Sequence, residues 1–325
     1  MTIPEVLLEV RNLVVEFPTR RVLLRAIDDV SFSIMPGEVL GVVGESGAGK
    51  SITGAAIIGL LEPPGQITSG EILLSGQRID NLPLAQMSKI RGRKIGAIFQ
   101  DPLTSLNPLY TVGRQLAETI ETHLPLTANQ ARTRAIDLLK ATGIPAAEAR
   151  IDHYPHQFSG GMRQRVVIAL ALAADPKLIV ADEPTTALDV SIQAQIIALI
   201  KKLCSDNGTA VMLITHDMGV IAETADRVAV MYAGRIAELG PVAQVIHSPR
   251  HPYTVGLMGS IPSMTQNKAR LAQIDGAMPR LNAIPKGCAF NLRCTKTIDR
   301  CFVERPNLAA NTAGPLSKTA CWIAA

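Results

Sequence analysis

One glycine-rich segment stands out in the sequence: Gly44-Glu45-Ser46-Gly47-Ala48-Gly49-Lys50-Ser51. It satisfies every position of the phosphate-loop pattern, and it lies between the apolar run Val39–Val43 and a helical pattern over residues 52–60. The glycines let successive backbone N–H groups turn toward a phosphate, and the start of the helix adds its positive end. Lys50 can reach the β- and γ-phosphates, and the Ser51 hydroxyl can bind Mg²⁺. The segment therefore predicts a nucleotide site on a strand–loop–helix unit.

Other apolar runs predict the sheet that carries this loop. Residues 178–181 and 211–214 are apolar at every position, which is typical of parallel strands covered on both faces, and residues 228–231 form a further strand. Strands of this kind alternating with helices indicate an α/β core. Residues 7–17 and 28–34 instead alternate polar and apolar side chains, which predicts an antiparallel sheet with one wetter face.

Two carboxylates follow the strand at 178–181. Asp182 and Glu183 would lie at the carboxyl edge of the sheet, where open parallel sheets bind their ligands. Asp182 would hold Mg²⁺ through its water shell, and Glu183 would act as the general base toward the attacking water. The alternative is a strand end capped by two solvated acids, which is the less favoured interpretation beside a complete phosphate loop.

The composition limits the other possibilities. The length of 325 residues suggests about two domains. No run of roughly 18 consecutive apolar residues occurs, and the N-terminus has no pattern of a signal peptide. Aromatic residues make up 3% of the chain, which argues against a platform that stacks nucleic-acid bases. Between residues 101 and 174 the strand pattern stops, and a capping box at Thr127–Gln130 opens one of the helices of an expected insertion.

The C-terminal region differs from the rest in charge and in cysteine content. Residues 246–325 contain ten Lys and Arg against three Asp and Glu, which gives this segment a net charge of +7. Because the whole chain has a net charge of +4, residues 1–245 have a net charge of −3. This shift predicts a separate C-terminal module. Four of the five cysteines lie in it: Cys288, Cys294, Cys301 and Cys321.

The cysteine spacing leaves three interpretations open. It fits a tetrahedral zinc ribbon poorly, since such modules place two to four residues between paired ligands. Four thiolates can also hold an iron–sulfur cluster, or the thiols can be free or disulfide-linked. The fifth cysteine, Cys204, lies in a helical pattern and is expected to be an ordinary core thiol.

The segment Phe158–Arg165 resembles the signature of ATP-binding cassette ATPases, usually written LSGGQ, with Phe at its first position and Met at its fifth. The other elements of this family occur in the order that the family has: Phe17 at the adenine-stacking position, Gln100 at the glutamine loop, Ala187-Leu188-Asp189 at the dimer-contact loop, and His216 at the switch histidine. The resemblance covers roughly residues 5–245. It implies a P-loop NTPase fold with a RecA-like parallel-sheet core, an antiparallel β subdomain, a helical insertion and an irregular cysteine-containing C-terminal extension.

The resemblance also implies roles for these residues. Ser159-Gly160-Gly161 would close over ATP bound to a second, head-to-tail ATPase subunit. Gln100 would bind Mg²⁺ and sense the γ-phosphate, and His216 would contact the γ-phosphate and position Glu183 and the water. A nucleotide-binding domain over residues 1–245, with a helical subdomain at about 101–174, would precede a C-terminal extension over residues 246–325.

Three segments narrow the resemblance to the ATP-binding subunits of dipeptide and oligopeptide permeases: Phe99–Pro108, Tyr154–Phe158 and Pro249–Thr254. Members of this group also move nickel, glutathione or antimicrobial peptides, so the cargo stays open. The implied partners are a second ATPase subunit in a heterodimer, two transmembrane permease subunits and, indirectly, an extracytoplasmic peptide-binding protein, with no nucleic acid. The implied location is the cytoplasmic face of a bacterial plasma membrane, as a peripheral subunit.

For the four C-terminal cysteines the resemblance implies a 4Fe–4S cluster, and Arg293, Lys296 and Arg300 between them are expected to offset its negative charge. The alternative at the level of the whole chain is a non-transport ATP-binding cassette protein that acts on DNA repair or on the ribosome. Such proteins usually carry two cassettes or zinc insertions, which this chain lacks.

Overall fold

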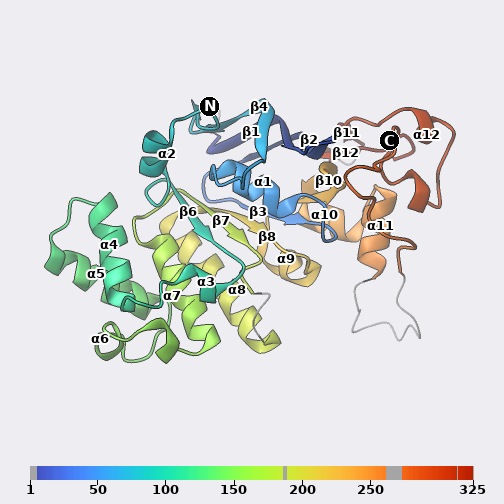
Figure 1. Ribbon diagram of the computed structural model, residues 1–325. Coiled ribbons are helices and arrows are strands. Elements are labelled where there is room, and N and C mark those ends of the chain that lie inside the picture. The colour runs from blue at the N-terminus through green and yellow to red at the C-terminus, as the bar shows by residue number, and fades with distance from the viewer. Residues whose placement is uncertain (1–5, 186–188, 261–272, 313, 325) are drawn as a thin grey trace, which may run out of the picture. The chain divides into compact units, whose positions relative to one another are not determined.

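The structure is a computed structural model that describes residues 6–185, 189–260, 273–312 and 314–324 (Figure 1). The chain forms two compact units. One, here called the helical unit, contains residues 1–7, 34–38 and 81–213. The other, here called the phosphate-loop unit, contains residues 8–33, 39–80 and 214–325.

The phosphate-loop unit contains a four-stranded sheet in the order β2-β1-β4-β5. Its strands are β1 (Leu8–Pro18), β2 (Leu23–Ile34), β4 (Gln66–Leu74) and β5 (Gln77–Arg78). β1 and β4 are antiparallel, with Leu8 opposite Leu74 and Glu16 opposite Gln66. The predicted strands at 7–17 and 28–34 are confirmed as β1 and β2. Alternate residues are buried on each side of a register shift between Arg11 and Val14, Leu8 and Val10 before it and Leu13 and Val15 around it.

The same unit contains a second set of strands in the order β11-β12-β10-β9-β3. They are β3 (Val39–Val43), β9 (Arg227–Tyr232), β10 (Arg235–Pro241), β11 (Ala309–Asn311) and β12 (Gly314–Thr319). β3 runs parallel to β9, whereas β10 is antiparallel to both β9 and β12. The helices are α1 (Lys50–Ile57), α9 (Met218–Thr224), α10 (Val242–His247), α11 (Pro252–Gly259) and α12 (Arg300–Val303), with a 3₁₀ turn, η2 (Asn291–Arg293).

The helical unit contains three strands in the order β8-β7-β6, namely β6 (Ile95–Ile98), β7 (Leu178–Asp182) and β8 (Ala210–Ile214), with β6 parallel to β7. Its helices are α2 (Leu84–Ile90), α3 (Pro102–Ser105), α4 (Val112–His123), α5 (Ala128–Ala141), α6 (Ala147–Arg150), η1 (Pro155–Gln157), α7 (Gly160–Leu172) and α8 (Val190–Asn207). The predicted change from strands to helices between residues 101 and 174 is confirmed, and the apolar runs at 178–181 and 211–214 are buried strands.

The helix α5 begins as its sequence predicts. The Thr127 side chain accepts the N–H of Gln130, and the Gln130 side chain accepts the N–H of Thr127 at 2.9 Å, which completes the capping box. Ala131, Ala135 and Leu139 form its buried face. Over the part of the chain that the structure describes, no helix combines the length and the apolar character that a membrane crossing requires.

Candidate nucleotide site

The phosphate loop joins β3 to α1, and its glycines adopt conformations that other residues rarely reach. Gly44 and Gly49 have φ angles of +150° and +103°. A Cβ atom at Gly44 would lie 2.3 Å from the carbonyl oxygen of Met231, and one at Gly49 would lie 2.6 Å from Cδ1 of Ile27. Both positions therefore require glycine for conformation and for space, which lets the backbone form the tight turn of a phosphate cradle.

Lys50 is the first residue of α1 and is only 6% exposed. Its Nζ donates hydrogen bonds to the carbonyl oxygens of Gly44 at 2.8 Å and of Glu45 at 3.1 Å. The ammonium group is thus held across the loop, where it can exchange backbone oxygens for phosphate oxygens. Ser51 follows on the exposed side of the first turn.

In the helical unit, the predicted catalytic carboxylate and the glutamine-loop residue lie together. Gln100 Nε2 donates a hydrogen bond to Glu183 Oε2 at 3.1 Å. Glu183 follows the last residue of β7, Asp182, and has a φ angle of +45°. A non-glycine residue in the left-handed region carries backbone strain, which is common where a side chain must take a fixed direction.

The Ser-Gly-Gly segment lies at the exposed N-terminus of α7. Ser159 is the N-cap, and its hydroxyl accepts the N–H of Met162 at 3.4 Å. Phe158, which replaces the usual Leu, is 2% exposed, and its ring meets His153 edge-on with centroids 6.2 Å apart. Phe in place of Leu therefore packs in the core, and Ser159-Gly160-Gly161 remains at the surface.

Phe17 and His216 belong to the phosphate-loop unit. His216 is exposed, two residues before α9, whose N-cap Asp217 accepts the N–H of Gly219 at 2.7 Å. Phe17 is half-buried near the end of β1, with its ring against Gly65, where a Cβ would lie 2.6 Å from Phe17 Cε1. In the predicted dimer-contact loop, Asp189 is the N-cap of α8, whereas Ala187 and Leu188 lie outside the described residues.

The four C-terminal cysteines have free thiols. The pKa of Cys288 is raised to about 11, mainly by burial and to a lesser extent by the thiols of Cys301, Cys321 and Cys294. Burial, with Cys294 and Cys301, also raises the pKa of Cys321. Among the residues that the structure describes, no three His, Cys, Asp or Glu side chains are placed as ligands of one metal ion. The four thiols are neighbours, and Cys294 Sγ also accepts the N–H of Lys296 at 3.4 Å.

The expectation for Cys204 is confirmed. It lies in α8 and is 1% exposed. Burial alone raises the pKa of its thiol to about 12, so that the group stays protonated at neutral pH.

Arg293 and Arg300, which are expected to offset the charge of a cluster, each pair with an acidic side chain. Arg300 Nη2 donates to Glu304 at 3.0 Å, and its guanidinium lies 3.5 Å from the ring centre of Trp322. Arg293 Nη1 donates to both carboxylate oxygens of Glu45, each at 3.1 Å. The acidic partner of each arginine is not evident from the sequence. The partner of Arg293, Glu45, belongs to the phosphate loop.

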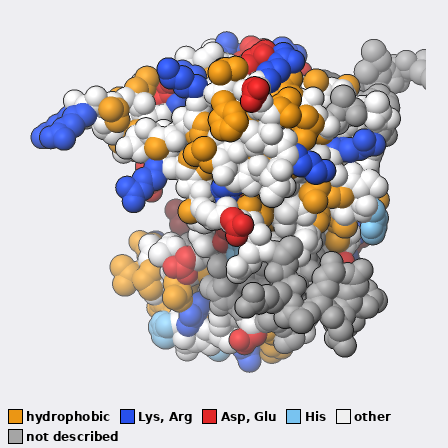
Figure 2. Space-filling model, turned by 90° about the vertical axis from the view of Figure 1, so that its right-hand side faces the viewer, with side chains coloured by type: hydrophobic (Ala, Val, Ile, Leu, Met, Phe, Trp, Pro, Cys, Tyr) orange, Lys and Arg blue, Asp and Glu red, His pale blue; other side chains and the backbone are white. Residues whose placement is uncertain are grey.

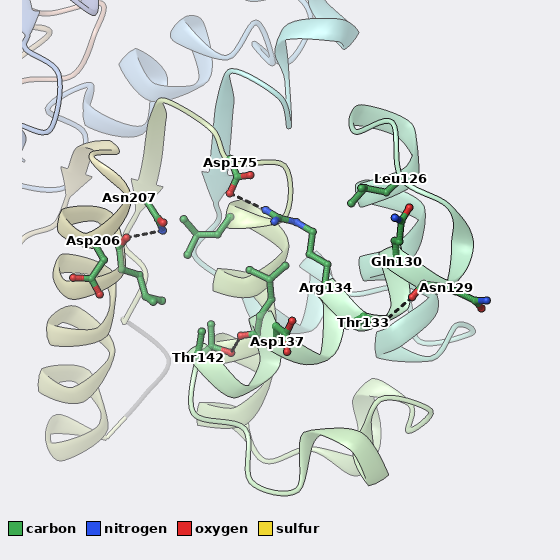
Figure 3. Close-up of a pocket in the computed structure, with 14 residues that line it drawn as sticks. Leu126, Asn129, Gln130, Thr133, Arg134, Asp137, Thr142, Asp175, Asp206 and Asn207 are labelled. Carbon is green, nitrogen blue, oxygen red and sulfur yellow. Dashed lines mark hydrogen bonds and ion pairs between the residues drawn. The ribbon is translucent and has the colours of Figure 1, made fainter.

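A groove of about 670 Å³ lies elsewhere in the helical unit, between α5 and the C-terminal ends of α7 and α8 (Figure 3). Arg134 reaches Asp175 in it, with Nη2 2.7 Å from Oδ1, while Asp137 and Asp206 also line it. None of the nucleotide-site residues predicted from the sequence lines this groove.

Comparison with known proteins decides the family. The family model described as "ABC transporter" matches residues 27–186, and the model described as "Oligopeptide/dipeptide transporter, C-terminal region" matches residues 237–301. The chain is 46% identical to the dipeptide transport ATP-binding protein DppD of Escherichia coli (strain K12) over 312 residues, which cover 96% of this chain and 95% of that one. It belongs to the peptide-transporter ATP-binding proteins of the ABC family.

Further relatives of this family agree. The oligopeptide transport ATP-binding protein OppD of Bacillus subtilis (strain 168) is 50% identical over 302 residues, covering 92% of this chain and 84% of that one. A dimeric post-hydrolysis structure of the cassette MJ0796 bound to ADP and Pi has a TM-score of 0.65 at 30% identity, covering 72% of this chain and 98% of that one. The predicted α/β P-loop NTPase fold is confirmed, and the chain is an ABC-type ATPase.

Proposed function

We propose that this ATPase powers the import of dipeptides or oligopeptides through a separate membrane permease. The observation that carries the proposal is the similarity over nearly the whole chain to ATP-binding proteins named for dipeptide and oligopeptide transport, with a second family match in the C-terminal region. ATP binding would bring two such ATPase subunits together head to tail, and hydrolysis would separate them.

The proposed ATP site assigns one task to each predicted residue. The loop Gly44–Ser51 would cradle the phosphates, with Ser51 and Gln100 on Mg²⁺ and Asp182 reaching the ion through water. Glu183 would act as general base, which the hydrogen bond from Gln100 supports because it fixes the carboxylate. The other assignments are Phe17 on the adenine, His216 on the γ-phosphate, and Ser159-Gly160-Gly161 on the ATP of the second subunit. The exposed N-terminus of α7 supports this last assignment, because its amides are open to an anion.

The proposed assembly contains two ATPase subunits, as a heterodimer, and two transmembrane subunits, supplied by an extracytoplasmic peptide-binding protein. The chain would lie on the cytoplasmic face of the plasma membrane. Within it, residues 1–245 would form the nucleotide-binding domain and residues 246–325 the extension.

Co-purification followed by transport tests this proposal. The tagged chain is extracted from its native membrane, and the complex that accompanies it is placed in vesicles together with its binding protein. We expect uptake of a radiolabelled dipeptide or pentapeptide that requires ATP on the side of this chain. Uptake of nickel or glutathione with no uptake of either peptide would overturn the peptide assignment, and the absence of any membrane partner would overturn the transport role.

For the four C-terminal cysteines we propose a 4Fe–4S cluster. Four thiolates are the donor set that such a cluster takes, and a backbone N–H already donates to Cys294 Sγ. When bound, a cluster would supply four covalent cross-links and one-electron chemistry.

The Cys294→Ser variant tests the cluster. Anaerobically purified protein is expected to be brown and to contain about four iron atoms per chain. The Cys294→Ser variant should lose most of this iron and its visible absorption, because one of the four thiolates is removed. Cys204→Ser is the matched control and should retain both. A colourless protein with one zinc per chain would contradict the proposal.

A further inference from the structure

Glu45, the first variable residue of the phosphate loop, is held from three directions within its own unit. Its backbone N–H donates to the Tyr253 hydroxyl at 2.9 Å. Its carbonyl oxygen accepts from Lys50 Nζ at 3.1 Å, and its carboxylate accepts from Arg293. Tyr253 and Arg293 both belong to the C-terminal region, more than 200 positions away in the sequence. The C-terminal region therefore contacts the backbone and the side chain of one loop residue.

Figure 2 shows Lys and Arg side chains at the surface of one face of the molecule, whereas the Arg293 side chain is only 8% exposed. Its Nε donates to the carbonyl oxygen of Asp275 at 2.8 Å, and its Nη2 lies 3.3 Å from the carbonyl oxygens of Ile274 and Gly276. Because Nη1 donates to the Glu45 carboxylate, every nitrogen of the guanidinium makes a hydrogen bond. A buried, fully bonded guanidinium fixes its carboxylate partner far better than an exposed ion pair does.

An aromatic cluster and the cysteine segment set the position of Arg293. Tyr232, Tyr253 and Phe290 pack with ring centres 4.7 to 5.5 Å apart. Phe290 precedes η2, whose last residue is Arg293 and whose C-cap is Cys294. The backbone N–H of Cys288 also donates to the carbonyl of Cys301 at 2.8 Å. Arg293 therefore lies within the segment that joins Cys288 to Cys294, next to the aromatic cluster.

We propose that Arg293 is a positioning residue for the ATP site, which sets the affinity of the phosphate loop for nucleotide by neutralising and fixing Glu45. The inference rests on the proposed ATP site. Its physical reason is electrostatic as well as geometric. The Glu45 carboxylate belongs to a loop that must receive the negative charge of the phosphates, and Arg293 neutralises it while fixing the loop. Without Arg293 the carboxylate is left to repel the nucleotide.

The test measures the Kd of the full chain for ATP by fluorescence titration. Arg293→Met should weaken ATP binding about tenfold, the size expected from losing one charge-assisted contact. Arg293→Lys, which keeps the charge, should fall between this variant and the unaltered chain. Adding Glu45→Gln to Arg293→Met should restore most of the affinity, because it removes the unneutralised carboxylate. At saturating ATP the turnover rate should change little, so that the effect appears in KM.

The matched control is Arg300→Met, which removes a cation next to Cys301 that has no contact with the loop. It should bind ATP within about twofold of the unaltered chain. Three results would each overturn the inference without touching the proposed function. These are an equal loss of ATP affinity in Arg293→Met and Arg300→Met, an unchanged ATP affinity in Arg293→Met, and no recovery of affinity when Glu45→Gln is added. If the unaltered chain bound no ATP, the proposed function would fall and this inference with it.

Discussion

Replacing Glu183 by Gln should reduce ATP turnover by about a thousandfold while leaving ATP binding within about twofold. The amide has the shape of the carboxylate and can still meet the side chain of Gln100, which lies 3.1 Å from Glu183 Oε2. It cannot accept the proton of the attacking water. Because the step that separates two ATP-bound subunits is lost, the variant should also accumulate as an ATP-dependent dimer. Single-turnover phosphate release and size-exclusion chromatography with ATP measure the two effects.

Glu148→Gln is the control for this prediction. Glu148 lies in the same unit and pairs with Lys140 on the surface, so that its loss should leave turnover unchanged. Full turnover in Glu183→Gln would remove Glu183 as the general base. A loss of ATP binding equal to the loss of turnover would instead give Glu183 a role in binding.

Replacing Lys50 by Ala should weaken ATP binding by about a hundredfold, since an ammonium group that would bond two phosphates is lost. In the structure this ammonium is buried and bonded to the carbonyl oxygens of Gly44 and Glu45. Its removal takes away both the charge that attracts the nucleotide and the donor that organises the loop. Equilibrium titration with a fluorescent ATP analogue measures the effect.

Two controls separate binding from folding in the Lys50 variant. Lys50→Met keeps the aliphatic stem in its buried position and should lose affinity to a similar extent, with a smaller change in Tm without nucleotide. Lys202→Ala removes an exposed lysine of α8 and should bind ATP normally. Unchanged ATP affinity in both Lys50 variants would contradict the assignment of the cradle.

The elements that the sequence predicts well are those with a strong local pattern. The run Val39–Val43 is β3 to the residue, and Thr127 and Gln130 form the predicted capping box. Buried apolar strands and helix caps are encoded by a few adjacent residues, so that their signals survive without any tertiary information. The nearness of Gln100 and Glu183 followed from the order of the family motifs rather than from a local pattern.

What the sequence does not reveal depends on contacts between distant residues. The short strands β11 and β12 are defined by their pairing, β12 with β10 and β11 with β12, and β12 begins with Gly314 and Pro315, which have little strand character. Arg293 illustrates the same limit. Its place between two cysteines suggested a partner for thiolates, whereas its partner is Glu45, 248 positions earlier. No spacing rule predicts such a pair.

The pairing of β12 with β10 has a consequence for how the protein is made. Thr319 lies opposite Glu238, so that about eighty residues must leave the ribosome after β10 before its outer edge gains a partner. Until then the backbone groups along that edge are available to other extended chains, which is the usual origin of aggregation in nascent sheets. A chain that ended before residue 314 would leave Glu238 and Leu239 of β10 without the partner strand that β12 provides.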